Sequence, residues 1–210
     1  MSTPTPSLVL AAALLWAAVP AAAEEPGTAK ATFSMYCYWT GEATLGRVPG
    51  VLASRIGDLG GREIVEVVYD PAKTDLGQLT AALKKQDSFY SLIVADQAGQ
   101  SAATSHVAAG DVVVDPRPAH FIAPKHSLRT QHPELYYLDL DESQAIALNS
   151  WSYFGGPEPD VLTAEQKARR ARLAKKLLSQ RPGEALDPAA ARTGDARVAY
   201  RQQLEEWLGE

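Results

Sequence analysis

The sequence contains a single cysteine, Cys37, so no disulfide can form within one chain. Long apolar runs are also scarce: Leu8–Val19 has 12 residues, whereas a membrane-spanning helix needs about 20. Positive charge is in deficit, with 20 Lys and Arg against 25 Asp and Glu. This argues against nucleic acid as the main partner, because phosphate binding requires a basic surface. The 46% of hydrophobic residues in 210 are sufficient for one ordinary core.

The amino-terminal segment has the pattern of an export signal. The apolar run Leu8–Val19 is followed by Pro20 and three alanines at 21–23, a small-residue pattern typical of a cleavage site. No Lys or Arg precedes the run, so only the α-amino group supplies positive charge there. A disordered tail or a single membrane anchor is the alternative. We expect residues 1–23 to be a signal peptide and the mature protein to be secreted or periplasmic, without stable membrane insertion.

Export makes the lone cysteine informative. Oxidising compartments favour paired cysteines, and an odd one is either a reactive thiol or a partner in an intermolecular disulfide. The alternative is a buried cysteine that packs as a small hydrophobic residue. The position of Cys37 in the fold therefore has to decide between these interpretations.

Hydrophobic periodicity predicts an α+β fold. Two helices are expected, over 40–47 with Thr40 or Gly41 as cap, and from Leu76 onward with Asp75 as cap and Gln78 three residues later. Strands are expected at 31–36, 51–56, 62–69 and 89–95. The resulting order, β-α-β-β-α-β, is that of a ferredoxin-like (split β-α-β) two-layer sandwich. Cys37 then lies where the first helix begins, and the partial positive charge of a helix N-terminus favours a thiolate.

The rest of the chain is expected to add strands, one long loop and a helical extension. We predict an α+β domain over 24–156 and a C-terminal helical extension over 157–210. The loop 116–133, which contains several prolines, is long for a compact domain and suggests a cover over a cleft. The other expected segments are a polar loop at 96–104, strands within 107–114 and at 134–140, and helices at 141–149, from 163 and at 195–208.

Several stretches, taken in order, resemble the A class of methionine sulfoxide reductases. They are "YCYWTGE", "RVPGV", "IGDLGG", "GREIVEVVYDP" and "TDLGQLTAAL", and the resemblance covers about residues 31–95. It implies a peptide-methionine (S)-S-oxide reductase whose substrate is methionine sulfoxide in peptides or proteins. The roles it implies are a nucleophile at Cys37, an acid at Glu63, an aromatic wall for the substrate methyl group at Tyr38 and Trp39, and pocket-lining residues at Asp87 and Tyr90.

The sequence also departs from that family. Tyr36 and Thr40 stand where the family motif has glycines, and no second cysteine is present to resolve an oxidised Cys37. A reaction cycle would therefore need an external reductant, either a small thiol or a thioredoxin-like dithiol protein. No cofactor is expected.

Other interpretations of these residues stay open at this point. Tyr38 and Trp39 are of a type that usually packs in cores, and Glu66 would replace Glu63 as the carboxyl group if the strand register shifted. Three histidines spaced six apart fit neither helical nor strand ligand spacing, so no metal site is expected. The alternatives in function are a heavy-metal-binding module of the same fold, which would want a second cysteine at Thr40, and a non-catalytic binding domain.

Overall fold

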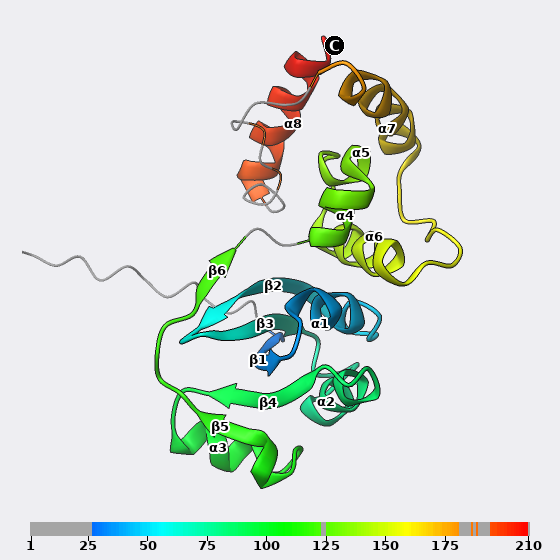
Figure 1. The fold of residues 1–210 in the computed structure, drawn as a ribbon. Coiled ribbons are helices and arrows are strands. Elements are labelled where there is room, and N and C mark those ends of the chain that lie inside the picture. Colours follow the sequence, from blue (N-terminus) through cyan, green and yellow to red (C-terminus); the bar gives the residue numbers. More distant parts are fainter. Residues whose placement is uncertain (1–26, 123–124, 181–185, 187, 189–193, 210) are drawn as a thin grey trace, which may run out of the picture.

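The computed structural model describes residues 27–122, 125–180, 186, 188 and 194–209, so the expected signal peptide at 1–23 lies outside the described residues. Figure 1 shows the fold. The elements in chain order are β1 (Ala29–Met35), α1 (Tyr38–Leu45), β2 (Val51–Leu59), β3 (Arg62–Tyr69), α2 (Leu76–Lys85), β4 (Phe89–Val94), α3 (Gln97–Ala103), η1 (Ala109–Asp111), β5 (Val112–Val114), β6 (His120–Ile122), α4 (His126–Gln131), α5 (Pro133–Tyr136), α6 (Glu142–Phe154), α7 (Ala164–Leu177) and α8 (Gly194–Leu208).

The centre of the molecule is a six-stranded sheet in the order β5-β4-β1-β3-β2-β6. β1 pairs antiparallel with β3 and β4, and β2 pairs antiparallel with β3 and β6. β5 pairs parallel with β4. The first six elements follow the order expected from the sequence, and the fold is of the mixed α+β class.

Helices α1 and α2 cover one face of this sheet. Phe33 and Val65 stand opposite each other on β1 and β3, and both side chains are fully buried with Leu45 of α1 and Leu79 of α2. Because side chains alternate along a strand, one face of β3 meets these helices and the other face does not. The second face carries a smaller cluster around Ile64, covered by Phe121.

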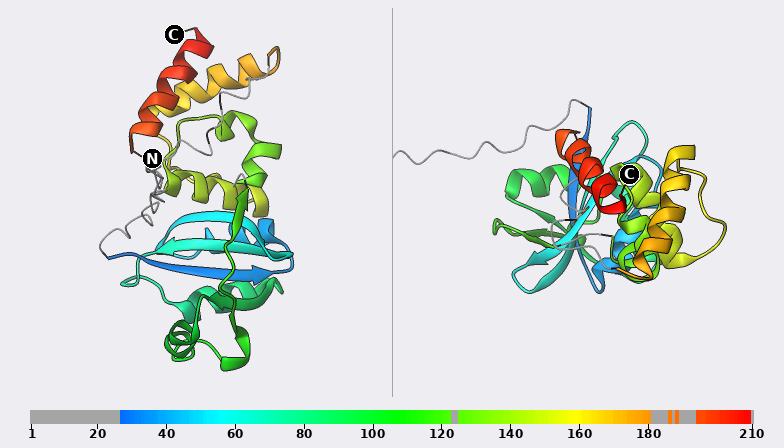
Figure 2. Two further views of the ribbon diagram at one scale, coloured as in Figure 1. Left: turned by 90° about the vertical axis from the view of Figure 1, so that its left-hand side faces the viewer. Right: turned by 90° about the horizontal axis from the view of Figure 1, so that it is seen from above.

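A second hydrophobic core joins the C-terminal helices. Leu128 of α4, Leu148 of α6, Leu173 of α7 and Leu204 of α8 are fully buried in one cluster. In Figures 1 and 2 these helices lie beyond the β2 edge of the sheet, while α3 and β5 lie at the opposite edge. The helical extension thus packs on the preceding helices α4–α6, and α6 in turn contacts α1 and β2.

The prediction of a strand at 134–140 was wrong, because this stretch contains the short helix α5. Pro133 occupies the first turn of that helix, where a missing N–H costs nothing. Tyr136 is buried and Tyr137 packs against the same cluster. The apolar residues of this stretch are buried in the core of the C-terminal helices, and they do not form the alternating pattern of a strand.

Two predicted loops also contain regular structure. In the stretch 96–104 the Asp96 side chain accepts a hydrogen bond from the Gly99 backbone at 2.8 Å and caps α3. The 116–133 segment holds β6 and α4. The helix expected at 141–149 continues to Phe154, with the capping box of Asp141 and Gln144 in place.

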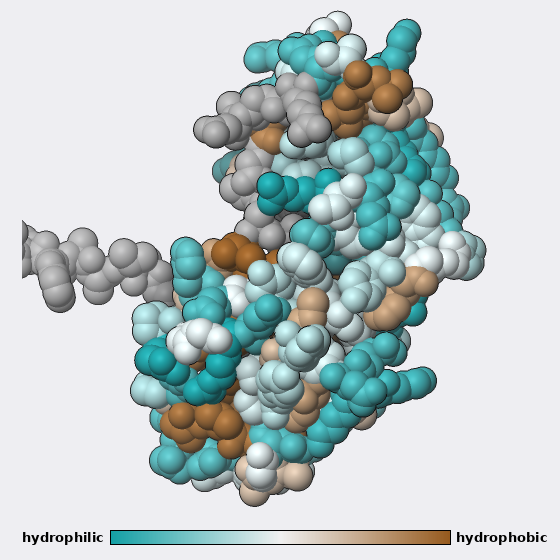
Figure 3. Space-filling view, viewed as in Figure 1, coloured by the Kyte–Doolittle hydropathy of each residue, from teal (hydrophilic) through white to brown (hydrophobic). Residues whose placement is uncertain are grey.

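The surface drawn in Figure 3 is mostly hydrophilic, and its hydrophobic areas form separate patches. Within the part of the chain that the structure describes, no helix is both long and apolar enough to cross a membrane.

Asp115 connects the segment before β6 to the sheet through ion pairs with Arg117 and Arg62. These ion pairs make the stability of the folded state depend on pH in the acid range. Its carboxylate accepts two hydrogen bonds from the Arg117 side chain, at 2.9 and 2.7 Å, and lies 3.2 Å from Arg62. The Arg117 hydrogen bond, reinforced by the charges of Arg117 and Arg62, lowers the pKa of Asp115 from 3.8 to about 2. A depressed pKa stabilises the folded state above pH 3.8, and that contribution is lost as the pH falls toward 2.

We therefore expect the stability difference between the wild type and Asp115→Asn to be largest near neutral pH and to shrink between pH 3.8 and 2. Urea unfolding at several pH values would measure it. Asp87→Asn serves as the control, because the Asp87 side chain is exposed. A difference that stays constant down to pH 2 would contradict this role of the Asp115 carboxylate.

Candidate active site

Cys37 occupies the N-cap position of α1. Its backbone is extended (φ −138°, ψ 116°), its side chain makes no capping hydrogen bond, and its carbonyl accepts the Gly41 N–H at 3.0 Å. The thiol is free and half-buried. The structure therefore places it at the helix start, as the sequence indicated, although α1 begins at Tyr38 and not at Thr40.

Gly41 explains why α1 can start so close to the sheet. A Cβ atom at this position would lie 1.8 Å from the sulfur of Met35 on β1 and 2.7 Å from its terminal methyl carbon, so only glycine fits without a shift of Met35. The first turn of α1 consequently sits directly on β1, and Cys37 stays next to the sheet.

Glu63 reaches the same helix start from β3. Its Oε2 atom accepts the backbone N–H of Tyr38 at 2.7 Å, and so takes the place of a side-chain cap on the first turn. Since side chains alternate along β3, Glu63 lies on the face with the buried Val65. Glu66 lies on the other face and pairs with Arg55 at 2.7 Å. Of these two carboxylates, Glu63 is thus the one that lies at the start of α1, bonded to the residue that follows Cys37.

Aromatic rings surround the helix start. The Tyr38 and Trp39 rings pack edge to face with centroids 5.7 Å apart, and Tyr38 also packs against the core. Burial raises the pKa of Tyr38, with smaller contributions from the charges of Glu63 and Cys37. Trp39 is 38% exposed, so its indole is accessible from solvent.

The segment containing Asp87 and Tyr90 lies beside Cys37. Ser88 joins the two: its carbonyl accepts the Tyr36 N–H at 3.1 Å, and its hydroxyl donates to the Cys37 carbonyl at 3.5 Å. Asp87 is exposed with a left-handed backbone (φ 50°), and Tyr90 is 61% exposed. Both are therefore at the surface, in the segment whose Ser88 bonds the Cys37 backbone, and neither belongs to the core.

Several residues beyond position 96 contact the 37–42 segment and were not singled out for this role from the sequence. His126 stacks on Trp39, with ring centroids 3.7 Å apart and planes at 5°. The Tyr153 hydroxyl shares a hydrogen bond of 2.6 Å with the Thr40 hydroxyl. Lys125 binds Glu42 of α1. No local pattern signals these contacts, because each spans more than 80 residues of chain.

The contacts of Lys125 define a buried cluster, here called the Lys125 cluster. The Lys125 side chain is fully buried, and its Nζ atom lies 3.0 Å from Glu42, 2.9 Å from the Ser54 carbonyl and 3.0 Å from Glu142. Its backbone N–H donates to the second Glu42 oxygen at 2.9 Å, which also accepts from Asn149. This cluster ties α1 and β2 to the helices α4 and α6.

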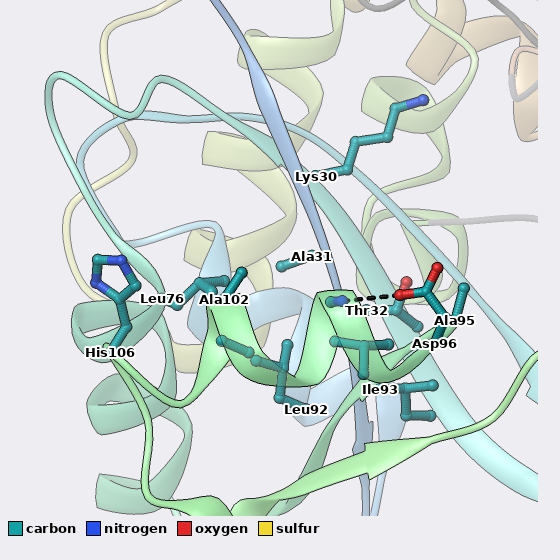
Figure 4. Close-up of a pocket in the computed structure, with 13 residues that line it drawn as sticks. Lys30, Ala31, Thr32, Leu76, Leu92, Ile93, Ala95, Asp96, Ala102 and His106 are labelled. Carbon is teal, nitrogen blue, oxygen red and sulfur yellow. Dashed lines mark hydrogen bonds between the residues drawn. The ribbon is translucent and has the colours of Figure 1, made fainter.

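Two hollows in the described structure lie away from Cys37. The larger, of about 430 Å³, is drawn in Figure 4 and lies between α3 and the start of β1, with Lys30, Leu92 and His106 among its lining residues. A second, of about 250 Å³, lies on the opposite face of the sheet from α1, beside Phe121. Cys37 follows the other end of β1 and lines neither of these two hollows.

Within the described ranges, no three His, Cys, Asp or Glu side chains gather as a metal site would require. Thr40, where a heavy-metal-binding module would carry its second cysteine, is hydrogen-bonded to Tyr153 instead.

Comparison with known proteins gives one partial match. A peptide methionine sulfoxide reductase MsrA from Geobacter metallireducens is 38% identical over 73 residues, which cover 27% of this chain and 45% of that protein. The chain thus matches less than half the length of this relative. No family model matches. The match supports an MsrA-like relationship over part of the chain.

Proposed function

We propose that this protein is an exported, thiol-dependent reductase of methionine sulfoxide, built on a ferredoxin-like core. The observation that carries the proposal is the 2.7 Å hydrogen bond between Glu63 and the Tyr38 backbone, which holds a carboxyl group beside the lone cysteine. The antiparallel order β4-β1-β3-β2 supports the ferredoxin-like assignment. The partial MsrA match supports the reaction class.

In the proposed first half-reaction, the Cys37 thiolate attacks the sulfur of the sulfoxide. The S–O bond breaks and the leaving oxygen takes up a proton, supplied by the carboxyl group of Glu63 in its protonated form. The hydroxide that is released then adds to the Cys37 sulfur, and the sulfur–sulfur bond formed in the attack breaks with its electron pair on the substrate sulfur. The net result is a thioether product and a sulfenic acid on Cys37, so the substrate gains two electrons and the cysteine loses two.

The second half-reaction restores the thiol. An external thiol condenses with the sulfenic acid to a mixed disulfide and releases water, and a second thiol displaces Cys37. Because the chain has no other cysteine, both thiols come from outside, as two small molecules or as one thioredoxin-like dithiol protein. The proposed cycle uses no other cofactor.

The neighbouring side chains suit a substrate with an apolar methyl group beside a polar S–O bond. Tyr38 and Trp39 would contact the methyl group through ring surface, and Asp87 and Tyr90 would line the approach. We propose that the substrate is methionine sulfoxide in peptides or proteins. We also propose that the mature protein begins near residue 24 and is secreted or periplasmic. The domain division at residue 156 stays a prediction.

The direct test combines turnover with mass spectrometry. Purified protein with dithiothreitol should reduce a peptide that carries methionine sulfoxide. Without reductant, the same substrate should add one oxygen, about 16 Da, to Cys37. The proposal fails if no thioether forms while a known reductase is active in parallel.

Glu63→Gln separates proton donation from helix capping. The amide oxygen of glutamine can still accept the Tyr38 N–H, so we expect the stability to change little. An amide cannot supply the proton, so sulfoxide reduction should fall by about 10²- to 10⁴-fold. Steady-state kinetics measure the effect, with Glu66→Gln on the opposite face of β3 as matched control. A wild-type rate in Glu63→Gln would rule out Glu63 as the acid.

A further inference from the structure

The stacked rings of His126 and Trp39 join the candidate active site to the helices beyond residue 125. Centroids 3.7 Å apart and planes at 5° describe a face-to-face stack, so one face of the indole is covered by the imidazole. Trp39 lies two residues after Cys37 and is 38% exposed. An exposed side chain in the first turn of a helix would otherwise sample several rotamers.

The Lys125 cluster holds His126 in this place. Lys125 precedes His126, adopts the left-handed conformation (φ 63°), and is bound through both its backbone and its side chain to Glu42. Glu42 belongs to α1, three residues after Trp39. Both rings of the stack are thus attached to the same helix, one directly and one through a buried ion pair.

The imidazole of His126 is suited to stack as a neutral ring. Burial lowers the pKa of His126, and the nearby Arg129 lowers it further, with Glu42 opposing. Near neutral pH the neutral form of the ring therefore predominates. It can act as a flat surface that occupies one side of the indole and leaves the other side free.

We propose that His126 is a positioning residue, which fixes the Trp39 indole in the orientation that receives the substrate next to Cys37. The inference rests on the proposed reductase function. Without the stack, the substrate would have to immobilise Trp39 on binding, and ordering one such side chain weakens binding by roughly three- to tenfold. The loss should appear mainly in KM, because His126 takes no part in proton transfer.

The test compares two substitutions at His126 in the full chain. His126→Leu removes the ring, and we expect kcat/KM for a methionine sulfoxide peptide with dithiothreitol to fall roughly three- to tenfold, with kcat nearly unchanged. His126→Phe keeps a flat ring and should restore most of kcat/KM. His132→Leu is the matched control, since the His132 ring packs against a different tryptophan, Trp151, with ring centroids 4.7 Å apart.

Fluorine NMR of protein labelled with fluorotryptophan gives a readout of the stack itself, with the Trp39 resonance assigned through Trp39→Phe. His126→Leu should shift that resonance, whereas His132→Leu should not. The positioning role is overturned if the Trp39 resonance stays in place, or if it shifts while kcat/KM of His126→Leu equals that of the wild type. An inactive wild type would instead overturn the reductase function, and the positioning role with it.

Discussion

Replacing Cys37 with serine is expected to abolish sulfoxide reduction and leave the fold intact. The hydroxyl group of serine is a much weaker nucleophile, and loss of a nucleophile reduces turnover by at least about 10³-fold. The Cys37 side chain makes no capping hydrogen bond, so the fold loses no interaction of this kind. Serine is a favoured N-cap residue, and the stability should therefore stay within about 0.5 kcal/mol or increase.

Two measurements on the same preparation check this expectation. Turnover with dithiothreitol reports the chemistry, and thermal unfolding reports the fold. A structural cysteine would give the opposite pattern, with reduced stability and retained activity. Turnover at the wild-type rate in Cys37→Ser would show that the nucleophile lies elsewhere.

Among the substitutions proposed here, Lys125→Met is expected to lower the free energy of unfolding most. Lys125→Met leaves Glu42, which is 2% exposed, as a buried carboxylate without its cation. Removing one partner of a buried ion pair typically costs about 3–5 kcal/mol. Urea unfolding would measure the loss, and Lys73→Met is the control, because its pair with Asp70 is exposed and surface changes usually stay within about 0.5 kcal/mol.

A double substitution tests the origin of that loss. In Glu42→Gln/Lys125→Met neither charge of the buried Glu42–Lys125 pair remains. The loss of stability in the double variant should therefore be smaller than the sum of the losses in the two single variants. Additive effects would show that packing of the Lys125 side chain, and not its charge, determines the stability.

Local signals in the sequence predicted much of the fold. The strand predicted at 62–69, with apolar residues on both faces, coincides with β3, in which the consecutive Ile64 and Val65 are both fully buried. The Asp75 side chain caps α2 by accepting the backbone N–H of Gln78, as expected, and Asp141 and Thr163 cap α6 and α7 in the same way. These features involve neighbours within a few residues, where periodicity and capping chemistry decide the structure.

Features that depend on distant contacts were not predictable in this way. Nothing near Lys125 in the sequence indicates that it is fully buried, because its partner Glu42 is 83 residues away. The same holds for His126 and Tyr153, which contact Trp39 and Thr40 only after α4 and α6 pack on α1. The choice between Glu63 and Glu66 depended on which face of β3 meets the helices, and the register of the folded sheet decides that.

The attachment of α1 to the C-terminal helices has a consequence for dissecting the molecule. A fragment limited to residues 31–95 would leave Glu42 and Ser54 without Lys125, and the carbonyl of Ala43 without its 2.7 Å bond from Ser150. It would also uncover the inner side of α1 that α6 protects. The stretch that carries the lone thiol is therefore not autonomous, and grafting it onto another scaffold would require the surface of α4 and α6 to be transferred as well.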